Sequence, residues 1–172
     1  FHQACRLGIL MKDLFTLDIK NYLPQWNKEK RDSSRGIIIA KGKKVLPFSP
    51  DDKISLVFAK NQGYYKFPGG GIHADEDRID ALIREVSEET GLSVISKSIK
   101  EFGKVKRFQK STHSECTIFE QESFYYFADV EDKIHEQNLD SYEMDAGFEL
   151  RTVPIKEAVS TNMQYKSKDS FD

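Results

Sequence analysis

The sequence is poor in the features that mark several classes of protein. Its only cysteines among 172 residues are Cys5 and Cys116, which fit two reduced thiols better than a disulfide framework, with one bridge as the alternative. No run approaches the roughly 20 apolar residues of a membrane helix, and Leu7–Met11 is too short for a signal-peptide core. The net charge of −2 gives no general attraction to nucleic acid or anionic membranes. These absences predict a soluble, cytoplasmic protein with no stable nucleic-acid or membrane partner.

Internal repeats, low-complexity stretches and Gly/Ser- or Pro-rich linkers are also missing from the sequence. A chain of this length can bury about 70% of its unfolded surface, so we expect one domain, over residues 35–172. Residues 1–34 mix apolar side chains with a charged run and are expected to form an N-terminal extension packed on the core. Part of this extension could be upstream or tag sequence, because the residues from Met11 onward are typical of the N-terminus of a protein.

Alternating strand and helix signals predict a mixed α/β fold. Apolar, β-branched runs at Gly36–Ala40 and Ile54–Ala59 are typical of buried strands, and the segment Lys41–Lys53 between them carries turn residues. Pro154 opens a short helix. Four further strands are expected, over residues 64–67, 94–96, 102–108 and 123–130.

The clearest helix signal runs from about Glu76 to Thr90. Asp75 is the expected N-cap, and Gly91 the residue at which the helix stops. Just upstream, residues 68–71 read Pro-Gly-Gly-Gly, and such a sequence predicts a loop whose backbone another group approaches closely.

Three glutamates, Glu85, Glu88 and Glu89, share one face near the end of this helix because they are spaced at i, i+3 and i+4. Like charges at this spacing cost about 0.2–0.5 kcal/mol, and acids at a helix C-terminus oppose its dipole. A hard divalent cation would convert the repulsion into shared ligation, with Mg²⁺ the best fit and Mn²⁺ also possible. Taken alone, the three glutamates fit a solvated acidic helix face better than a metal site.

The wider pattern resembles the Nudix box of the MutT-like Nudix hydrolases. Gly70 is followed by five residues, Glu76, seven residues and the segment Arg84–Leu92, which reads REVSEETGL and matches every fixed position of that signature. Such a match arises by chance on the order of once in 10⁸ positions. The resemblance covers roughly residues 35–160, since the segment from Gly147 to Ala158 is similar to the C-terminal end of the family's domain.

This resemblance implies an α/β/α sandwich on a mixed β-sheet, with the box forming a loop-helix-loop motif. It implies a magnesium-dependent pyrophosphohydrolase that splits a diphosphate bond in a nucleoside diphosphate linked to another group. Nucleoside triphosphates, ADP-ribose and dinucleotides are all open as substrates. The alternatives are a catalytically silent nucleotide sensor of the same fold and a scaffold that binds calcium structurally. Homodimers are common among similar proteins, so a homodimer stays open here.

The resemblance also assigns roles by position. It makes Glu85, Glu88 and Glu89 metal ligands, with the Gly69 carbonyl as a further ligand. Arg84 is expected to pair with a neighbouring carboxylate and hold the helix face in register. Three residues are expected to support the box: Gly70, Glu76 and Gly91.

The general base and the substrate contacts are less closely defined. Glu85 is one candidate base, and Glu122 is favoured among the carboxylates that follow the box because it borders an aromatic strand. The other later carboxylates considered are Glu120, Glu143 and Glu149. Substrate contacts are expected from Tyr65 and Phe67, beside the glycine loop, and from Arg107, in a basic stretch with interleaved aromatics. Core packing and a solvated strand face are the respective alternatives.

Overall fold

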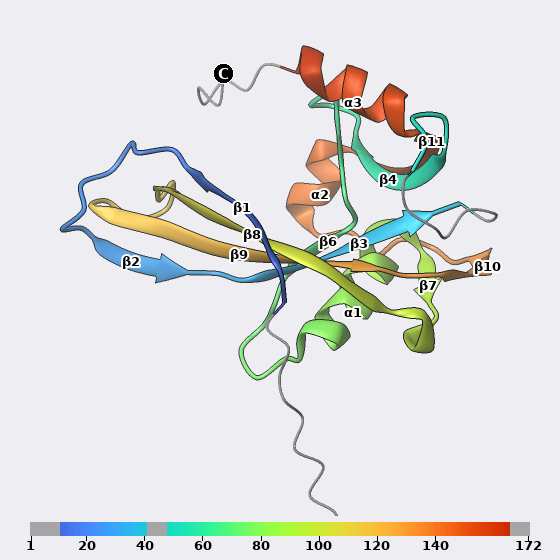
Figure 1. The fold of residues 1–172 in the computed structure, drawn as a ribbon, viewed down its shortest axis with the longest axis horizontal. Helices are drawn as coiled ribbons and strands as arrows, with labels where there is room; N and C mark the ends of the chain where they lie inside the picture. Colours follow the sequence, from blue (N-terminus) through green and yellow to red (C-terminus); the bar gives the residue numbers. More distant parts are fainter. Residues whose placement is uncertain (1–10, 41–47, 166–172) are drawn as a thin grey trace, which may run out of the picture.

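A twisted sheet of nine strands runs through the molecule in the computed structural model, which describes residues 11–40 and 48–165 (Figure 1). A further sheet pairs β10 with β7. The strands are β1 (Asp13–Asp18), β2 (Asn27–Lys30), β3 (Ser33–Ile39), β4 (Lys53–Ala59), β5 (Tyr64–Lys66), β6 (Gly69–Gly71), β7 (Leu92–Val94), β8 (Lys100–Lys110), β9 (Thr117–Phe127), β10 (Val130–Ile134) and β11 (Phe148–Pro154). The helices are α1 (Arg78–Thr90), α2 (Ser141–Ala146) and α3 (Ile155–Gln164), with a 3₁₀ turn, η1, at Ser96–Ser98.

The main sheet is mixed. Its strand order is β1-β8-β9-β3-β4-β11, with β2 added to β9, β5 to β4 and β6 to β3. The pairs β8–β9, β3–β4 and β4–β11 are antiparallel, whereas β3 runs parallel to β9. The central position of β3 matters most for the site, because β6, the strand just before the acidic helix, pairs with it.

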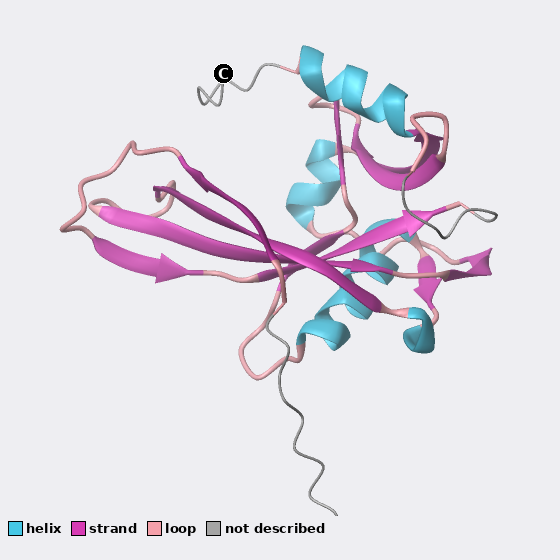
Figure 2. Cartoon of the chain, in the orientation of Figure 1, coloured by secondary structure: helices cyan, strands magenta, loops and turns pink. Residues whose placement is uncertain are grey.

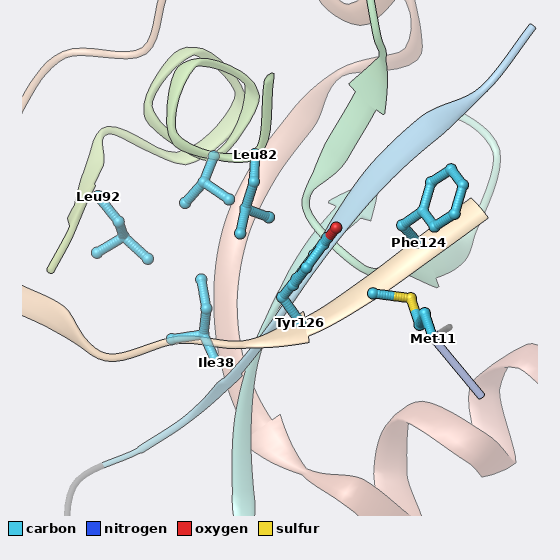
Figure 3. Packing of buried hydrophobic residues seen from close by; sticks show 7 residues of the cluster. Met11, Ile38, Leu82, Leu92, Phe124 and Tyr126 are labelled. Carbon is cyan, nitrogen blue, oxygen red and sulfur yellow. The ribbon is translucent and has the colours of Figure 1, made fainter. Parts of the chain in front are cut away.

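Two apolar layers form on opposite faces of β3, as the alternation of side chains along a strand requires. Ile38 packs with Leu82 and Val86 of α1, as Figure 3 shows for the cluster that also holds Phe124 and Tyr126. Its neighbour Ile37 packs in a separate cluster with residues of β4, β5 and α3. Figure 1 accordingly shows α1 on one side of the crossing strands and α3 on the other, which confirms the predicted α/β/α arrangement.

The described part of the N-terminal extension contributes two strands to the sheet. β1 pairs parallel with β8, and β2 pairs parallel with β9. These four strands form the part of the sheet that projects from the core, which we call the ribbon (Figure 1). Figure 2 shows strands and loops alone in this projecting part of the described chain. Met11, just before β1, is buried in the cluster beneath α1. Cys5 and residues 41–47 lie outside the described residues, and Cys116 is an exposed free cysteine.

The start of the acidic helix was predicted wrongly. Asp75 has φ 64°, a left-handed conformation that an N-cap does not adopt, whereas Asp77 is extended and its carboxylate accepts a hydrogen bond from the Ile79 amide at 2.7 Å. Asp77 is therefore the N-cap. The predicted stop is confirmed, because Gly91 is the C-cap, with φ 71°.

Several other elements differ from the prediction in kind or in where they end. The glycine segment was predicted as a loop, yet Gly69–Gly71 forms β6 by pairing with the edge of β3. The strand predicted over residues 94–96 is β7, which ends at Val94 before η1. The strand predicted over 123–130 divides into β9 and β10, and α2 was not predicted at all. No helix in the described ranges is long and apolar enough to span a membrane.

Candidate metal centre

Helix α1 presents its acidic residues toward the β5–β6 segment. Its apolar side packs on the sheet through Leu82 and Val86, both fully buried, which fixes the rotation of the helix about its axis. Glu85 and Glu89, one helical turn apart, then lie on a neighbouring face that the glycine strand covers. Both glutamates are buried, so the part of the acidic face that they form is no solvated helix surface.

Glu89 is the most deeply buried carboxylate described, at 1% exposure. Its Oε2 accepts a hydrogen bond from the Gly69 amide at 2.7 Å, and its Oε1 accepts one from Lys66 Nζ at 2.6 Å. Gly69 has φ 136°, and a Cβ there would lie 2.9 Å from the Arg35 Cα, so only glycine brings this amide so close to β3. The backbone of the glycine strand thus holds one oxygen of Glu89 in place.

Glu85 lies against the next glycine. A Cβ on Gly70 would lie 2.5 Å from the Glu85 Cδ, which explains physically why the box has glycine at this position. Burial raises the pKa of Glu85, and this effect outweighs the opposing hydrogen bond from Arg84 Nη1 at 2.7 Å. A carboxylate kept from water in this way needs another source of positive charge.

A third carboxylate comes from outside the box. Glu143 of α2 joins Glu85 and Glu89, and one ligand oxygen from each lies within 4.8 Å of the others. Glu143 is fixed by a capping box: its Oε2 accepts the Asp140 amide at 2.9 Å, while Asp140 Oδ1 accepts the Glu143 amide at 2.8 Å. Burial also raises the pKa of Glu143. We call Glu85, Glu89 and Glu143 the carboxylate cluster.

Arg84 ties the box loop to the helix, as expected for its position. Its Nε and Nη2 bind the two oxygens of Glu76 at 2.7 and 2.8 Å, and Nη2 also reaches the Gly71 carbonyl at 3.1 Å. The same guanidinium contacts Glu85 and, at 3.2 Å, Glu88. The pair with Arg84 is the main reason that the pKa of Glu76 falls to about 2.

Two of the predicted ligands have other partners. Glu88 is not a member of the carboxylate cluster; its side chain is 36% exposed and turns to Arg84. The Gly69 carbonyl accepts a hydrogen bond from the Arg35 guanidinium, so a metal would have to compete with a fixed cation for this oxygen. The structure therefore brings together Glu85 and Glu89 of the predicted set and leaves Glu88 at the rim.

Glu122, the favoured base, lies in a cationic environment on the ribbon. Its carboxylate binds Lys104 Nζ at 2.8 Å and lies 3.6 Å from the ammonium groups of both Lys30 and Lys106. The hydrogen bond from Lys104 is the main reason that the pKa of Glu122 is lowered. A general base works best with a pKa near the operating pH, so these surroundings do not favour Glu122 in that role.

The two predicted aromatic contacts are packed in the protein. Tyr65 is 6% exposed, its ring lies 4.7 Å from that of Phe58, and its backbone amide and carbonyl both bond to the Asn162 side chain of α3. Tyr65 therefore matches the core alternative, because a base could stack on it only after the ring left the core. Phe67 is half-buried and packs edge-on against Tyr125, with ring centroids 5.5 Å apart.

Arg107, the predicted phosphate contact, is half-buried in β8. It lies between Leu17 of β1 and Gln121 of β9, and burial lowers the pKa of its guanidinium. Its substrate role stays a prediction.

The carboxylate cluster fits a hard divalent cation. Its three members offer only oxygen ligands, two of the three are buried, and clustered carboxylates in such a place repel one another unless a cation joins them. Oxygen ligation with few protein ligands suits Mg²⁺, which keeps several waters, and equally admits Mn²⁺.

Sequence reasoning missed the two residues that complete this centre. Glu143 was considered but ranked below Glu122, although the spacing Asp140-x-x-Glu143 is a capping-box signal that placed it at the start of a helix. Lys66 had no sequence signal, because a lysine before a glycine run ordinarily lies in solvent.

Comparisons with known proteins point to a single family. A family model described as NUDIX domain matches residues 41–171. The curated protein "Uncharacterized Nudix hydrolase YvcI" of Bacillus subtilis is 38% identical over 50 residues, which are 29% of this chain and only 32% of that protein.

Solved structures agree on the fold. A NUDIX hydrolase from Nitrosomonas europaea matches with a TM-score of 0.54 and 20% identity, covering 81% of this chain and 82% of that one. A MutT NUDIX hydrolase from Burkholderia pseudomallei matches with a TM-score of 0.50 and 16% identity, covering 73% of this chain and 84% of that one. At these identities the likeness extends to the fold alone.

Proposed function

This chain belongs to the Nudix hydrolase family, and from that premise we propose that it hydrolyses a diphosphate bond in a nucleoside diphosphate linked to another group, with Mg²⁺ as cofactor. Nucleoside triphosphates, ADP-ribose and dinucleotides are the substrate types considered. The observation that supports the proposal is the carboxylate cluster, in which buried Glu85 and Glu89 meet Glu143 within 4.8 Å. The intact cluster favours a hydrolase over a silent sensor.

In this proposal the members of the carboxylate cluster hold the cation, and Glu88 can join them from the rim. A cation held there would neutralise negative charge on the diphosphate and make an attacking water more acidic. The chain's own contribution is mainly one of position: the Gly69 amide fixes Glu89, and Arg84 fixes Glu85 through the 2.7 Å bond.

The proposed proton acceptor is Glu143 in place of Glu122. Glu143 joins the carboxylate cluster from α2, and among the described residues a hydrogen bond engages only its Oε2, from the Asp140 amide. Glu122, in contrast, is neutralised by Lys104 and its neighbours.

Product release from a panel of nucleoside triphosphates, ADP-ribose and dinucleoside polyphosphates tests this function. We expect turnover with Mg²⁺, none in EDTA, and a loss on the order of 100-fold for Glu89→Gln. Glu115→Gln, a matched change at an exposed glutamate, should retain full activity. Tight nucleotide binding without turnover in the wild-type protein would contradict the hydrolase and favour the sensor.

A further inference from the structure

Lys66 places an ammonium group at the carboxylate cluster. It is the last residue of β5, three positions before Gly69, and its side chain is only 23% exposed. Its Nζ lies 2.6 Å from Glu89 Oε1 and 4.1 Å from the ring centroid of Phe148, a buried residue of β11. The ammonium is thus held between a carboxylate and an aromatic face.

This position gives the ammonium an electrostatic role. Glu89 is almost fully buried, and an unpaired carboxylate at such a place is strongly unfavourable. The Gly69 amide already occupies Oε2, so Lys66 and an incoming cation both act on Oε1. A positive charge beside this oxygen stabilises the metal-free protein and opposes the entry of a second positive charge.

We propose that Lys66 is a built-in counter-ion of the carboxylate cluster: it neutralises Glu89 before the divalent cation binds, and then presents its ammonium to the substrate's diphosphate. Only the second part of this inference, the contact with the diphosphate, rests on the proposed function. The chemistry is suitable, because lysine is a flexible point charge with three donors, which can bind a phosphate oxygen as well as a carboxylate oxygen.

A purely structural ion pair would behave differently from a counter-ion. If Lys66 served only to orient Glu89 as a ligand, its removal would weaken Mg²⁺ binding. If it acts as a competing cation, its removal leaves the cluster more negative, and Mg²⁺ binds more tightly. The sign of the change in Mg²⁺ affinity therefore separates the two roles.

Three variants provide the test. Lys66→Met keeps the length of the side chain and removes the charge, Lys66→Arg keeps the charge, and Lys60→Met is the control, since Lys60 pairs with Glu149 at the surface with 62% of its side chain exposed. Isothermal titration calorimetry gives the Kd for Mg²⁺, thermal unfolding in EDTA gives the stability of the metal-free protein, and steady-state kinetics at saturating Mg²⁺ separates KM from kcat.

For Lys66→Met we expect a Kd for Mg²⁺ lowered about tenfold, as removal of a nearby unit charge predicts in a partly screened site. The metal-free Tm should fall, and Mg²⁺ should raise the Tm by more than in wild type. At saturating Mg²⁺ the KM should rise about tenfold with a smaller change in kcat, because the lost contact is to the diphosphate. Lys66→Arg keeps the charge and should give a Kd for Mg²⁺ nearer to the wild-type value than Lys66→Met does, whereas Lys60→Met should match wild type in every measurement.

An unchanged or raised Kd for Mg²⁺ in Lys66→Met would overturn the counter-ion role. An unchanged KM would overturn the contact with the diphosphate. If Lys66→Met does not fold, Lys66→Gln makes the same comparison with a neutral donor still facing Glu89. A wild-type protein that binds Mg²⁺ but hydrolyses nothing would overturn the proposed function, while the calorimetric comparison would still decide the counter-ion role.

Discussion

The backbone at Gly70 lies directly against the side chain of Glu85, a proposed metal ligand. Its Cα faces the Glu85 carboxylate so directly that a Cβ would lie 2.5 Å from the Glu85 Cδ. A methyl group there must push Glu85 out of the carboxylate cluster. The requirement is one of space, because the φ of Gly70 lies outside the left-handed region.

We therefore expect Gly70→Ala to lose Mg²⁺ affinity and hydrolysis by about 10- to 100-fold, the range seen when residues that support a metal ligand are changed. Gly63→Ala is the contrasting control: Gly63 has φ 85° with no atom within 4 Å of a Cβ, so it should lose about 1 kcal/mol of stability and keep its activity. Calorimetry and urea unfolding measure the two effects. Equal activity in both variants would refute the steric explanation.

The ion pair between Glu76 and Arg84 of the box makes the free energy of unfolding depend on pH. Its pKa is lowered from 4.5 to about 2, chiefly by Arg84, so the folded state favours the charged form. The stabilisation is complete above pH 4.5 and is lost as the pH falls toward 2. At pH 7 we expect Glu76→Gln to cost about 1–3 kcal/mol of unfolding free energy. Urea unfolding should show a smaller difference from wild type at pH 3, and an equal difference at both pH values would contradict this linkage.

At the scale of elements, the short helix α2 determines where the third carboxylate lies. It spans six residues, too few to be stable alone, and is held by its capping box. Asp140 thus orients Glu143 from outside the carboxylate cluster.

Asp140→Ala should loosen the first turn of α2 at a cost of about 1 kcal/mol. It should also weaken Mg²⁺ binding, because Glu143 loses the backbone geometry that points it at Glu85 and Glu89. Asp140→Ser keeps a capping oxygen and should restore both properties. Mg²⁺ affinity that is unaffected by Asp140→Ala would show that the cap does not position Glu143.

Some element boundaries and metal ligands could be predicted from the sequence, and others depend on the tertiary fold. The end of α1 was predictable because Gly91 supplies the left-handed C-cap locally, whereas its start was missed because Asp75 and Asp77 are both good caps by composition. β6 was taken for a loop, since its strand conformation arises from pairing with β3, a distant segment. Glu85 and Glu89 could be assigned from their spacing, but Glu143 joins them only through the tertiary fold.

At the scale of the whole molecule, the N-terminal extension is joined to the domain by packing as well as by strand pairing. Met11 is 9% exposed and lies in the cluster with Phe124 and Tyr126, on the sheet face that α1 covers (Figure 3). The sequence predicted that the N-terminal extension packs at the edge of the core. It could not show that the extension enters the core, because this depends on the parallel pairing of β1 with β8.

Met11→Ala should cost about 2–5 kcal/mol of unfolding free energy, the range for truncating a buried methionine. Met163→Ala is the matched control, because Met163 is 82% exposed and its truncation should change stability by less than about 0.5 kcal/mol. Chemical denaturation of both variants measures the difference. Equal stabilities would mean that Met11 does not contribute to the core.

The most direct test of the central claim is calorimetric titration of Mg²⁺ into Glu143→Gln and Glu122→Gln beside the wild-type protein. We predict that Glu143→Gln binds Mg²⁺ at least about tenfold more weakly and loses hydrolysis in parallel, while Glu122→Gln binds it like wild type. Weakened binding in Glu122→Gln, with Glu143→Gln unchanged, would contradict the assignment of the metal to the carboxylate cluster of α1 and α2.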